Sequence, residues 1–339
     1  MSWEPTTDQQ LRQLRAKMNR DIREFFYQRK VLEVETPALS QAGNTDPFIQ
    51  SFQTTGSDIT EDHSSTIPQR YLHTSPEYPM KRLLAAGSGD IYQICKVWRK
   101  EESGKNHNPE FTLLEWYRIG FTAQQLMQEV SELLHSVLTQ IKLPDKMYSY
   151  EQLFLEKFAI NPHIASYDEI LECVVTSIPS LDAYTSTDKP SNQLDRQALL
   201  DALLTYCIEP DFDKNCLTFV YDYPATQSAL AKLSNEQCEG DGKPPVALRF
   251  EVFLGQKELG NGYQEETSHQ RNTDILNKEN AQRHATGLKE VTVDNNFIEA
   301  AKSGIPESAG VAIGLDRVLM AITEVESIQK VINFPWDVA

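Results

Sequence analysis

The chain has 339 residues, of which 32 are lysine or arginine and 49 are aspartate or glutamate, which gives a formal net charge of −17 at pH 7. Hydrophobic residues make up 40% and charged residues 24%, an ordinary composition for a soluble globular protein that excludes disordered, collagen-like and fibrous classes. The acidic excess excludes a surface that binds nucleic acid everywhere by neutralising phosphates, although a local basic patch is compatible with it.

The sequence has no stretch of about 18 apolar residues that could span a membrane, and no apolar signal core near its start. We therefore expect a cytoplasmic protein without a membrane segment. None of the cysteines lies in a C-x-x-C motif, and their number is odd. This pattern predicts reduced, unpaired thiols and no zinc site. The cysteines are Cys95, Cys173, Cys207, Cys216 and Cys238.

The first part of the chain predicts two helices separated by a short strand and a long loop. Apolar residues recur at helical spacing over residues 8–29, and a short strand over residues 31–37 ends in a proline. Residues 42–70 are rich in Gly, Thr, Ser and Asp and predict mostly loop. The second helix is predicted to begin with Ser75 as N-cap and Pro76 at its first position.

A hairpin and an insertion are predicted next. Residues 91–101 predict a strand, residues 103–109 a polar loop, residues 110–118 the return strand, and residues 124–141 an amphipathic helix. Residues 142–215 mix helix and loop, and we interpret them as an insertion packed on the core. Further strand-like stretches lie at 216–223, at 246–254 and at the start of a strand-to-helix unit over 309–322.

The predicted hairpin carries residue types that suit a nucleotide. Strand alternation places Arg99 and Glu101 on one face, and Phe111, Glu115 and Tyr117 on one face of the return strand. An arginine can bind a phosphate through charge-assisted bonds, an aromatic ring can stack on a base, and an acid can bind an exocyclic amine. Taken alone, however, the hairpin fits a salt-bridged surface hairpin better.

Residues 310–317 (GVAIGLDR) form a second candidate segment. Their apolar alternation predicts a strand, and the small residues allow a ligand to approach the backbone closely. Arg317 would lie at the start of the following helix, where the helix dipole favours acids. An anionic ligand would explain an arginine there, although a glycine-rich strand alone is a weak signal.

A third segment, residues 249–265, predicts a hairpin with an acidic face. A turn at residues 255–256 would pair Phe253 with Glu258, and Glu251 with Gly260. Glu251 and Glu258 then lie on one face as diagonal neighbours, where they repel each other unless a cation or an arginine lies between them. Mg²⁺ bound to a triphosphate suits such a pair. The alternative is an acidic hairpin that faces solvent.

Strand alternation alone does not decide which face of the hairpin carries the side chains after this turn. A regular strand would point Asn261, Tyr263 and Glu265 to the face opposite the two glutamates. Gly260 and Gly262 allow a bulge or bend that would turn these side chains to the same face.

Together, the segments resemble the three signature motifs of class II aminoacyl-tRNA synthetases. Residues 25–37 resemble motif 1, residues 97–115 motif 2 and residues 310–320 motif 3. The resemblance covers nearly the whole chain. It implies an α+β fold, an antiparallel sheet flanked by helices, as one catalytic domain over residues 1–339 with a mainly helical insertion at about 142–215.

Within this class the chain is most similar to the catalytic domain of lysyl-tRNA synthetases. The matching segments are SPE at 75–77, HNPEF at 107–111 and ELGNG at 258–262. Two features differ: no room remains before motif 1 for an anticodon-binding β-barrel, and Ala312 replaces a motif 3 glycine. Both features resemble the stand-alone paralogue family that ligates β-lysine to translation elongation factor P.

That resemblance implies a reaction and its partners. The enzymes of this family form an aminoacyl-adenylate from ATP, with Mg²⁺, and lysine or β-lysine. They then transfer the acyl group to the ε-amine of a lysine on elongation factor P. The resemblance further implies a homodimer formed through motif 1, no membrane association and no stable tRNA binding.

The resemblance also implies residue roles at the nucleotide. Arg99 would contact the α-phosphate and the amino-acid carboxylate, and Arg317 the γ-phosphate, so these two arginines are the candidate catalytic residues. Glu251 and Glu258 would be the Mg²⁺ ligands. The remaining ATP-binding candidates are Glu101 and Asn108 at the adenine, Phe111 stacked on the base, Leu259, and Gly314 beneath the nucleotide.

For the amino acid, the resemblance implies a pocket lined by carboxylates and aromatic residues. Glu265 is assigned to the side-chain ammonium of the substrate, because a buried carboxylate is the partner that such a charge needs. A slip of one residue in register would give this role to Glu266. The other lining candidates are Ser75, Glu77, Tyr117, Asn261, Tyr263 and Ala312.

Other functions are compatible with parts of this pattern. A truncated lysyl-tRNA synthetase-like enzyme could aminoacylate tRNA or a small acceptor, and a class II core could instead make a free amide. A non-catalytic paralogue is a different class, but it predicts losses among four key residues that are all present: Arg99, Glu101, Glu258 and Arg317. If the acceptor is a folded protein factor, a restricted basic patch on this acidic chain is expected to dock it.

Overall fold

A computed structural model describes residues 3–54, 69–138, 144–181, 194–234 and 244–339. The chain forms two compact units. The first comprises residues 1–122, 136–138 and 265–339, and the second comprises residues 123–135 and 139–264. The described residues of the expected insertion lie in the second unit, and the prediction of a single catalytic domain stays a prediction.

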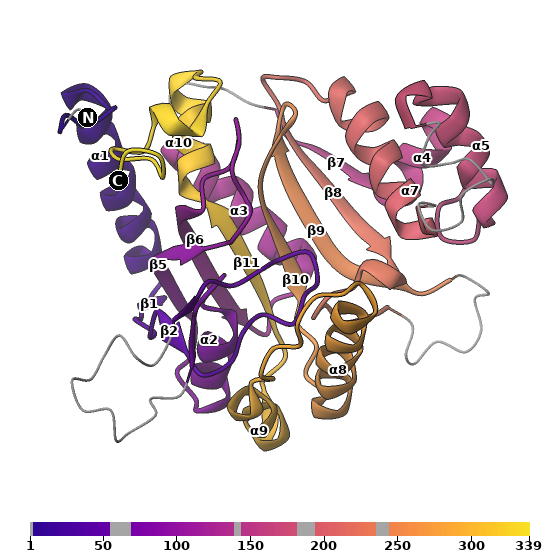
Figure 1. Ribbon diagram of the computed structural model, residues 1–339. Helices are drawn as coiled ribbons and strands as arrows, with labels where there is room; N and C mark the ends of the chain where they lie inside the picture. The colour runs from indigo at the N-terminus through magenta and orange to yellow at the C-terminus, as the bar shows by residue number, and fades with distance from the viewer. Residues whose placement is uncertain (1–2, 55–68, 139–143, 182–193, 235–243) are drawn as a thin grey trace. The chain divides into compact units, whose positions relative to one another are not determined.

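The first unit is built on four strands in the order β1 (Leu32–Glu33), β5 (Ile91–Trp98), β6 (Glu110–Ile119) and β11 (Ser308–Gly314) (Figure 1). β1 is parallel to β5, and the other pairs are antiparallel. A small sheet of β2 (Leu39–Ser40), β4 (Arg70–Leu72) and β3 (Gln53–Thr54) accompanies them. The helices are α1 (Gln9–Gln28), α2 (Glu77–Ala85), α8 (His269–Ala285), α9 (Asn295–Gly304) and α10 (Leu315–Thr323), with a 3₁₀ turn at Ile328–Lys330.

Helix α1 begins at a side-chain cap and packs one apolar face. The carboxylate of Asp8 accepts a hydrogen bond from the backbone N–H of Leu11, which satisfies one of the free donors of the first turn. The ring of Phe26 stacks on Tyr92 of β5 at 4.3 Å between centroids and meets Trp116 of β6 edge-on at 5.3 Å. These three buried aromatic side chains hold α1 against the strands that carry motif 2.

The N-terminal and C-terminal segments of the first unit are joined by backbone hydrogen bonds. The N–H of Thr6 donates to the carbonyl of Asn333 at 2.9 Å, and its hydroxyl donates to the carbonyl of Ile332 at 2.5 Å. The residues just before α1 are thereby fixed to the segment that follows α10.

The second unit has four strands in the order β10 (Lys257–Gln264), β9 (Val246–Leu254), β8 (Leu217–Pro224) and β7 (Lys146–Ser149). Its helices are α3 (Ala123–Val137, within this unit through residue 135), α4 (Tyr150–Phe158), α5 (Tyr167–Ser177) and α7 (Arg196–Leu203), followed by a π-helical turn at Leu204–Ile208. Short 3₁₀ turns lie at Pro179–Leu181, Glu209–Asp211 and Ala225–Gln227. Capping boxes start α4 at Ser149 and α5 at Ser166.

The core of the second unit explains why residues 144–215 fold on their neighbours. Apolar side chains of α4, α5 and α7 pack with residues of β8 and β9 in one buried cluster. Phe154 and Leu200 from the helices and Val220 from β8 are fully buried in it. The helical segment thus buries its apolar face against strands of the same unit, as the interpretation of a packed insertion expects.

Most predicted elements are confirmed, but several boundaries are wrong. The strand predicted over residues 31–37 covers only Leu32–Glu33. β5 ends at Trp98, so the strand predicted to reach residue 101 is three residues too long. The N-cap of α2 is Pro76, one residue after the predicted Ser75, whose hydroxyl accepts a hydrogen bond from the N–H of Glu77 at 3.3 Å. α3 ends at Val137, so the helix predicted to reach residue 141 is too long as well.

The predictions on thiols and membrane segments can be compared with the described part of the chain. Cys95, Cys173, Cys207 and Cys216 are free thiols, and Cys238 lies outside the described residues. Among the helices in the described ranges, none combines the length and the apolar character that crossing a membrane needs.

Candidate active site

A buried cluster of charged residues lies in the first unit, where the amino-acid pocket is expected. Glu77 and Lys81 are one turn apart on α2, and Glu265 precedes α8. The ammonium of Lys81 is 2.7 Å from Oε1 of Glu77 and 2.6 Å from Oε2 of Glu265. Its side chain is completely buried, and the side chain of Glu265 is 1% exposed. The structure therefore brings together two predicted pocket carboxylates around a lysine.

Strand β6 adds a third carboxylate to the cluster. Its ladder with β11 places Glu115 opposite Ala312 and Tyr117 opposite Gly310, so these four residues share one face. The hydroxyl of Tyr117 donates to Oε1 of Glu115 at 2.6 Å, and both side chains are buried. Ala312, the position that differs from the lysyl pattern, thus lies on the face that carries Tyr117, an expected pocket residue, and Glu115, which the sequence analysis did not assign to the pocket.

Burial is the largest cause of the pKa shifts of these acids. Burial and, after it, the neighbouring charge of Glu77 raise the pKa of Glu115 to about 8, while the hydrogen bond from Tyr117 opposes the shift. Burial also raises the pKa of Glu265 to about 7 against the opposing charge of Lys81. Such shifted carboxylates are typical of sites that bind charged ligands.

Gly310 is required by the packing of this cluster. A Cβ at this position would lie 2.5 Å from Cδ1 of Tyr117 and 2.5 Å from Oε1 of Glu265, distances that Cβ atoms do not adopt. The sequence predicted that small residues here allow a ligand to approach. At Gly310 the groups that approach are two side chains of the protein itself.

The nucleotide-binding candidates of motif 2 lie at and beyond the end of β5. The guanidinium of Arg99 lies 5.1 Å from the ring centroid of Phe111, and its Nε donates to the carbonyl of Thr74 at 3.4 Å. An ion pair joins the guanidinium of Arg99 to the carboxylate of Glu102 at 3.5 Å. Arg99 and Phe111 are thus adjacent, as a site for a phosphate and a stacked base requires.

Glu101 does not follow the predicted strand alternation. It lies in a turn with a left-handed backbone (φ 72°), so the prediction that it shares a strand face with Arg99 is wrong. The cause is that β5 has already ended, and a turn does not preserve the period of two. Its carboxylate accepts a hydrogen bond from Nε2 of Gln50 at 3.3 Å.

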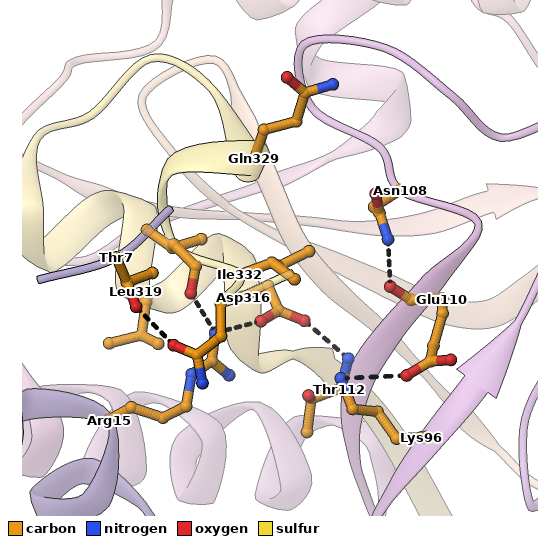
Figure 2. A network of polar contacts seen from close by, with 12 residues as sticks. Thr7, Arg15, Lys96, Asn108, Glu110, Thr112, Asp316, Leu319, Gln329 and Ile332 are labelled. Atoms are coloured by element: carbon orange, nitrogen blue, oxygen red, sulfur yellow. Dashed lines mark hydrogen bonds and ion pairs between the residues drawn. The ribbon is translucent and has the colours of Figure 1, made fainter. Parts of the chain in front are cut away.

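The side chain of Asn108 is buried and bonded to backbone groups (Figure 2). Its Nδ2 donates to the carbonyl of Glu110 at 2.6 Å, and its Oδ1 accepts a hydrogen bond from the N–H of Trp336 at 3.0 Å. The side chain therefore anchors the motif 2 loop to the C-terminal segment, which leaves the backbone of Asn108 as the group suited to an adenine contact.

Helix α10 presents Arg317 in its first turn, as predicted. Nη2 of Arg317 lies 2.8 Å from Nε2 of His107 in the motif 2 loop. The preceding residue, Asp316, is buried: it pairs with Arg15 of α1 at 2.5 Å and accepts a hydrogen bond from the N–H of Thr112 at 2.6 Å (Figure 2). Asp316 thus fixes the start of α10 between α1 and β6.

In the second unit, the β9–β10 hairpin has the predicted turn but a different register beyond it. Glu258 pairs with Phe253 as predicted, but Glu251 pairs with Asn261, so the predicted pairing of Glu251 with Gly260 is wrong. A bulge between Glu258 and Gly260 accommodates one extra residue, Leu259, and shifts the register. Asn261 consequently shares the face of Glu251, and Tyr263, opposite Arg249, does so too.

The two candidate metal ligands lie among further charges of that unit. Glu251 forms an ion pair with Arg249 at 2.5 Å. Burial raises the pKa of Glu251, Arg249 opposes the shift, and Glu258 adds to it. Burial and the charges of Glu251 and Glu258 also raise the pKa of Glu209 to about 7. Among the described residues, no group of three or more His, Cys, Asp or Glu side chains is arranged to hold a metal ion. A divalent cation at Glu251 and Glu258 would have to displace or share the charge of Arg249.

Glu266, the alternative partner of the substrate ammonium, faces α8. Its Oε1 accepts a hydrogen bond from the N–H of Ser268 at 2.8 Å, and its Oε2 pairs with Arg271 at 3.2 Å. Both contacts hold the Glu266 carboxylate near the N-terminus of α8, where the helix dipole favours an acid. Of the two adjacent glutamates, it is Glu265 that joins the buried cluster.

Sequence reasoning missed Lys81 and Arg249. A lysine on an amphipathic helix is usually read as a solvent-facing residue. The available signals were the spacing of Glu77 and Lys81, four residues apart, and that of Arg249 and Glu251, two residues apart on a strand.

Comparison with known proteins agrees with the motifs. Residues 3–338 match the profile of the family described as tRNA synthetases class II (D, K and N). A protein of Histophilus somni (strain 2336) named elongation factor P–(R)-beta-lysine ligase is 42% identical over 337 residues, 99% of this chain and 98% of its own length. Proteins of the same name are 40% identical in Pectobacterium atrosepticum and Pseudoalteromonas translucida, over 98% of this chain and 97% of theirs.

Proposed function

This chain belongs to the class II aminoacyl-tRNA synthetase family, and on that basis we propose that it is an ATP-dependent ligase that attaches (R)-β-lysine or lysine to a lysine of elongation factor P. The relatives that carry the name of this activity match the chain over almost their entire length. Since elongation factor P acts in translation, the proposed location is the cytoplasm, and the proposed assembly is a homodimer formed through motif 1.

The observation that carries this proposal is the cluster of acids around Lys81. Glu77, Glu115 and Glu265 supply three carboxylates, and Lys81 supplies one ammonium, so the cluster has acids left for cationic groups of a ligand. Lysine and β-lysine each carry two ammonium groups. A neutral amino acid would leave buried charges without partners, which is costly.

In the proposed first step, a carboxylate oxygen of the amino acid attacks the α-phosphorus of ATP. The bond from this phosphorus to the bridging oxygen breaks, and pyrophosphate leaves. Arg99 would hold the α-phosphate and the attacking carboxylate, Phe111 would stack on the base, and Arg317 would bind the γ-phosphate. This chemistry needs in-line placement and charge stabilisation and no protein nucleophile.

In the second step, the neutral ε-amine of the acceptor lysine attacks the carbonyl carbon of the adenylate. An amide bond forms, AMP leaves, and the amine loses its proton to solvent or to a phosphate oxygen of AMP. The overall reaction consumes ATP and the amino acid and releases pyrophosphate and AMP.

Magnesium fits the carboxylates of the second unit. We assign Glu251 and Glu258 to this ion, because oxygen ligands from one or two carboxylates are its usual protein contacts. When bound, Mg²⁺ supplies charge neutralisation at the phosphates. Leu259, which forms the bulge, Asn261 and Tyr263 keep the ligand-binding roles that the resemblance gives them, as do Ser75 and Gly314 in the first unit.

Label transfer tests this proposal. Purified protein is incubated with ATP, Mg²⁺ and radiolabelled lysine or β-lysine, together with elongation factor P or with total tRNA. We expect label on elongation factor P that resists alkaline treatment, as an amide does, and none when its acceptor lysine is replaced. Alkali-labile label on tRNA as the main product would favour the truncated lysyl-tRNA synthetase-like alternative. The Arg317→Ala protein is the matched inactive control.

A further inference from the structure

Lys81 is the least expected residue of the pocket. Lysine side chains are rarely buried completely, yet that of Lys81 has no exposed surface. Its ammonium contacts Glu77 of α2 and Glu265 and lies 5.8 Å from the ring centroid of Phe297 on α9. The lysine therefore joins residues that come from separate parts of the first unit.

The surroundings keep this ammonium charged. Burial alone would lower the pKa of Lys81, but the charges of Glu265 and Glu77 outweigh burial and raise it. The acids in turn depend on the lysine, because burial raises the pKa of Glu265 to about 7 even beside Lys81. Without Lys81, the carboxylates of Glu77 and Glu265 would lie close together with no ammonium between them, and Glu265 would keep its proton to a higher pH.

We propose that Lys81 is a positioning residue for substrate recognition: it acts as a built-in counter-ion that holds the carboxylates of Glu77 and Glu265 side by side, in place for the ammonium groups of the amino acid. This inference rests on the proposed function, because it assumes a lysine-type substrate. Lys81 itself stays bound to both acids and does not react.

The charged and titratable groups around the pocket are consistent with this role. Glu77 faces Lys81 from its own helix, Glu265 from the segment before α8, and Glu115 and Tyr117 from β6. Glu279 of α8 also interacts with Glu77. The cluster thus has more acidic groups than its one ammonium, and Glu115, whose pKa is about 8, can donate as well as accept a hydrogen bond near pH 7. The carboxylate of the substrate is assigned to Arg99.

The Lys81→Met variant, which keeps the length of the side chain without its charge, tests the inference. Pyrophosphate exchange is measured with lysine, β-lysine and ATP at pH 7 and pH 9. We expect the KM of the amino acid to rise about tenfold or more at pH 7, as for a shift of one pKa unit in a recognising acid, with the KM of ATP unchanged within about twofold. At pH 9 the acids are ionised even without the charge of Lys81. The ratio of the variant KM to the wild-type KM should therefore be at least about threefold smaller at pH 9 than at pH 7.

The outcomes separate this inference from the proposed function. An unchanged amino-acid KM in the variant, or an increase that is the same at both pH values, overturns the role of Lys81 while the proposed function stands. Wild-type exchange that does not require lysine or β-lysine overturns both. Lys17→Met is the matched control, because Lys17 also forms an ion pair four residues along its helix, with Asp21, but on the exposed side of α1.

A second pair of variants covers the case in which Lys81→Met does not fold. Glu265→Gln and the double variant Lys81→Met/Glu265→Gln leave fewer like charges buried. Glu115 and the substrate amines titrate in both assays, so the two proteins are compared by the ratio of their amino-acid KM values at each pH. The KM of the double variant relative to that of Glu265→Gln should fall as pH rises from 7 to 9, because only the double variant lacks the ammonium that pairs with Glu77. Identical pH profiles for the two proteins would overturn the inference.

Discussion

Replacing Gly310 by alanine should disable the amino-acid pocket without altering nucleotide binding. The new Cβ would lie 2.5 Å from both Tyr117 Cδ1 and Glu265 Oε1. Ordinary van der Waals contact begins at 3.4 Å, so each neighbour would have to move by about 0.9 Å. Both side chains are buried, with 3% and 1% of their surface exposed, and neither has open space to retreat into.

The magnitude follows from that displacement. Overpacking of this kind costs about 1–3 kcal/mol of stability. A misplacement of about 1 Å in a binding group can cost about 100-fold in activity. We therefore expect the amino-acid KM in pyrophosphate exchange to rise about 100-fold, equivalent to about 2.7 kcal/mol, while the KM of ATP changes by less than about threefold.

The control for this experiment is Gly104→Ala, since a Cβ at residue 104 meets no heavy atom within 4 Å. It should behave as wild type in stability and in both KM values. A folded Gly310→Ala protein with a wild-type amino-acid KM would refute the reasoning, because it would show that Tyr117 and Glu265 can move without loss of recognition.

The remaining predictions concern one residue each. Arg317→Ala should abolish ATP–pyrophosphate exchange, and retained exchange would rule out its motif 3 role. Ala312→Gly should gain activity towards α-lysine relative to β-lysine, measured as the ratio of kcat/KM values; an unchanged ratio would remove Ala312 from the pocket. The pKa of Glu115 is raised to about 8 in the folded protein, so the folded state keeps a proton that the unfolded chain loses above its ordinary pKa of 4.5. The free energy of unfolding should accordingly decrease as pH rises from about 5 to 8. Glu115→Gln should make this decrease shallower in urea titrations, and an unchanged slope would contradict the shifted pKa.

Elements with one strongly apolar face were predictable. The period of α1, the alternation of β6 and the strand-to-helix change from β11 to α10 are direct consequences of burying one side of an element. The hairpin of β5 and β6 was likewise predicted from its two apolar runs and the polar loop between them. The pairing of β6 with β11, which places Glu115 opposite Ala312 on one face, was not predicted, because their residues lie far apart in the sequence.

Local departures from regular geometry were not predictable in the same way. The bulge at Leu259 moves Asn261 to the face of Glu251, and the positive φ of Glu101 takes it out of the strand pattern. Glycines indicated that a bulge was allowed near Leu259, but its position depends on the pairing of the flanking strand. For Glu101 no residue type gave a signal, because glutamate does not favour a left-handed backbone.

The charged core was the largest omission. Periodicity assigns Lys81 to a helix but cannot tell whether a lysine is exposed or enclosed by acids from elsewhere in the chain. Its burial depends on Glu265, which lies more than 180 positions further along the sequence. Such partners become apparent only after the strands have been assembled.

The ion pair between Arg15 and Asp316 and the hydrogen bonds between Thr6 and Asn333 impose an order on folding. Their partners are separated by 301 and 327 positions, so α1 and the residues before it are completed by residues that are made some 300 positions later. Contacts so distant in sequence form slowly and late. During synthesis α1 must remain without these partners until residues 316–333 have been made, and the Arg317 end of the site is fixed only after that.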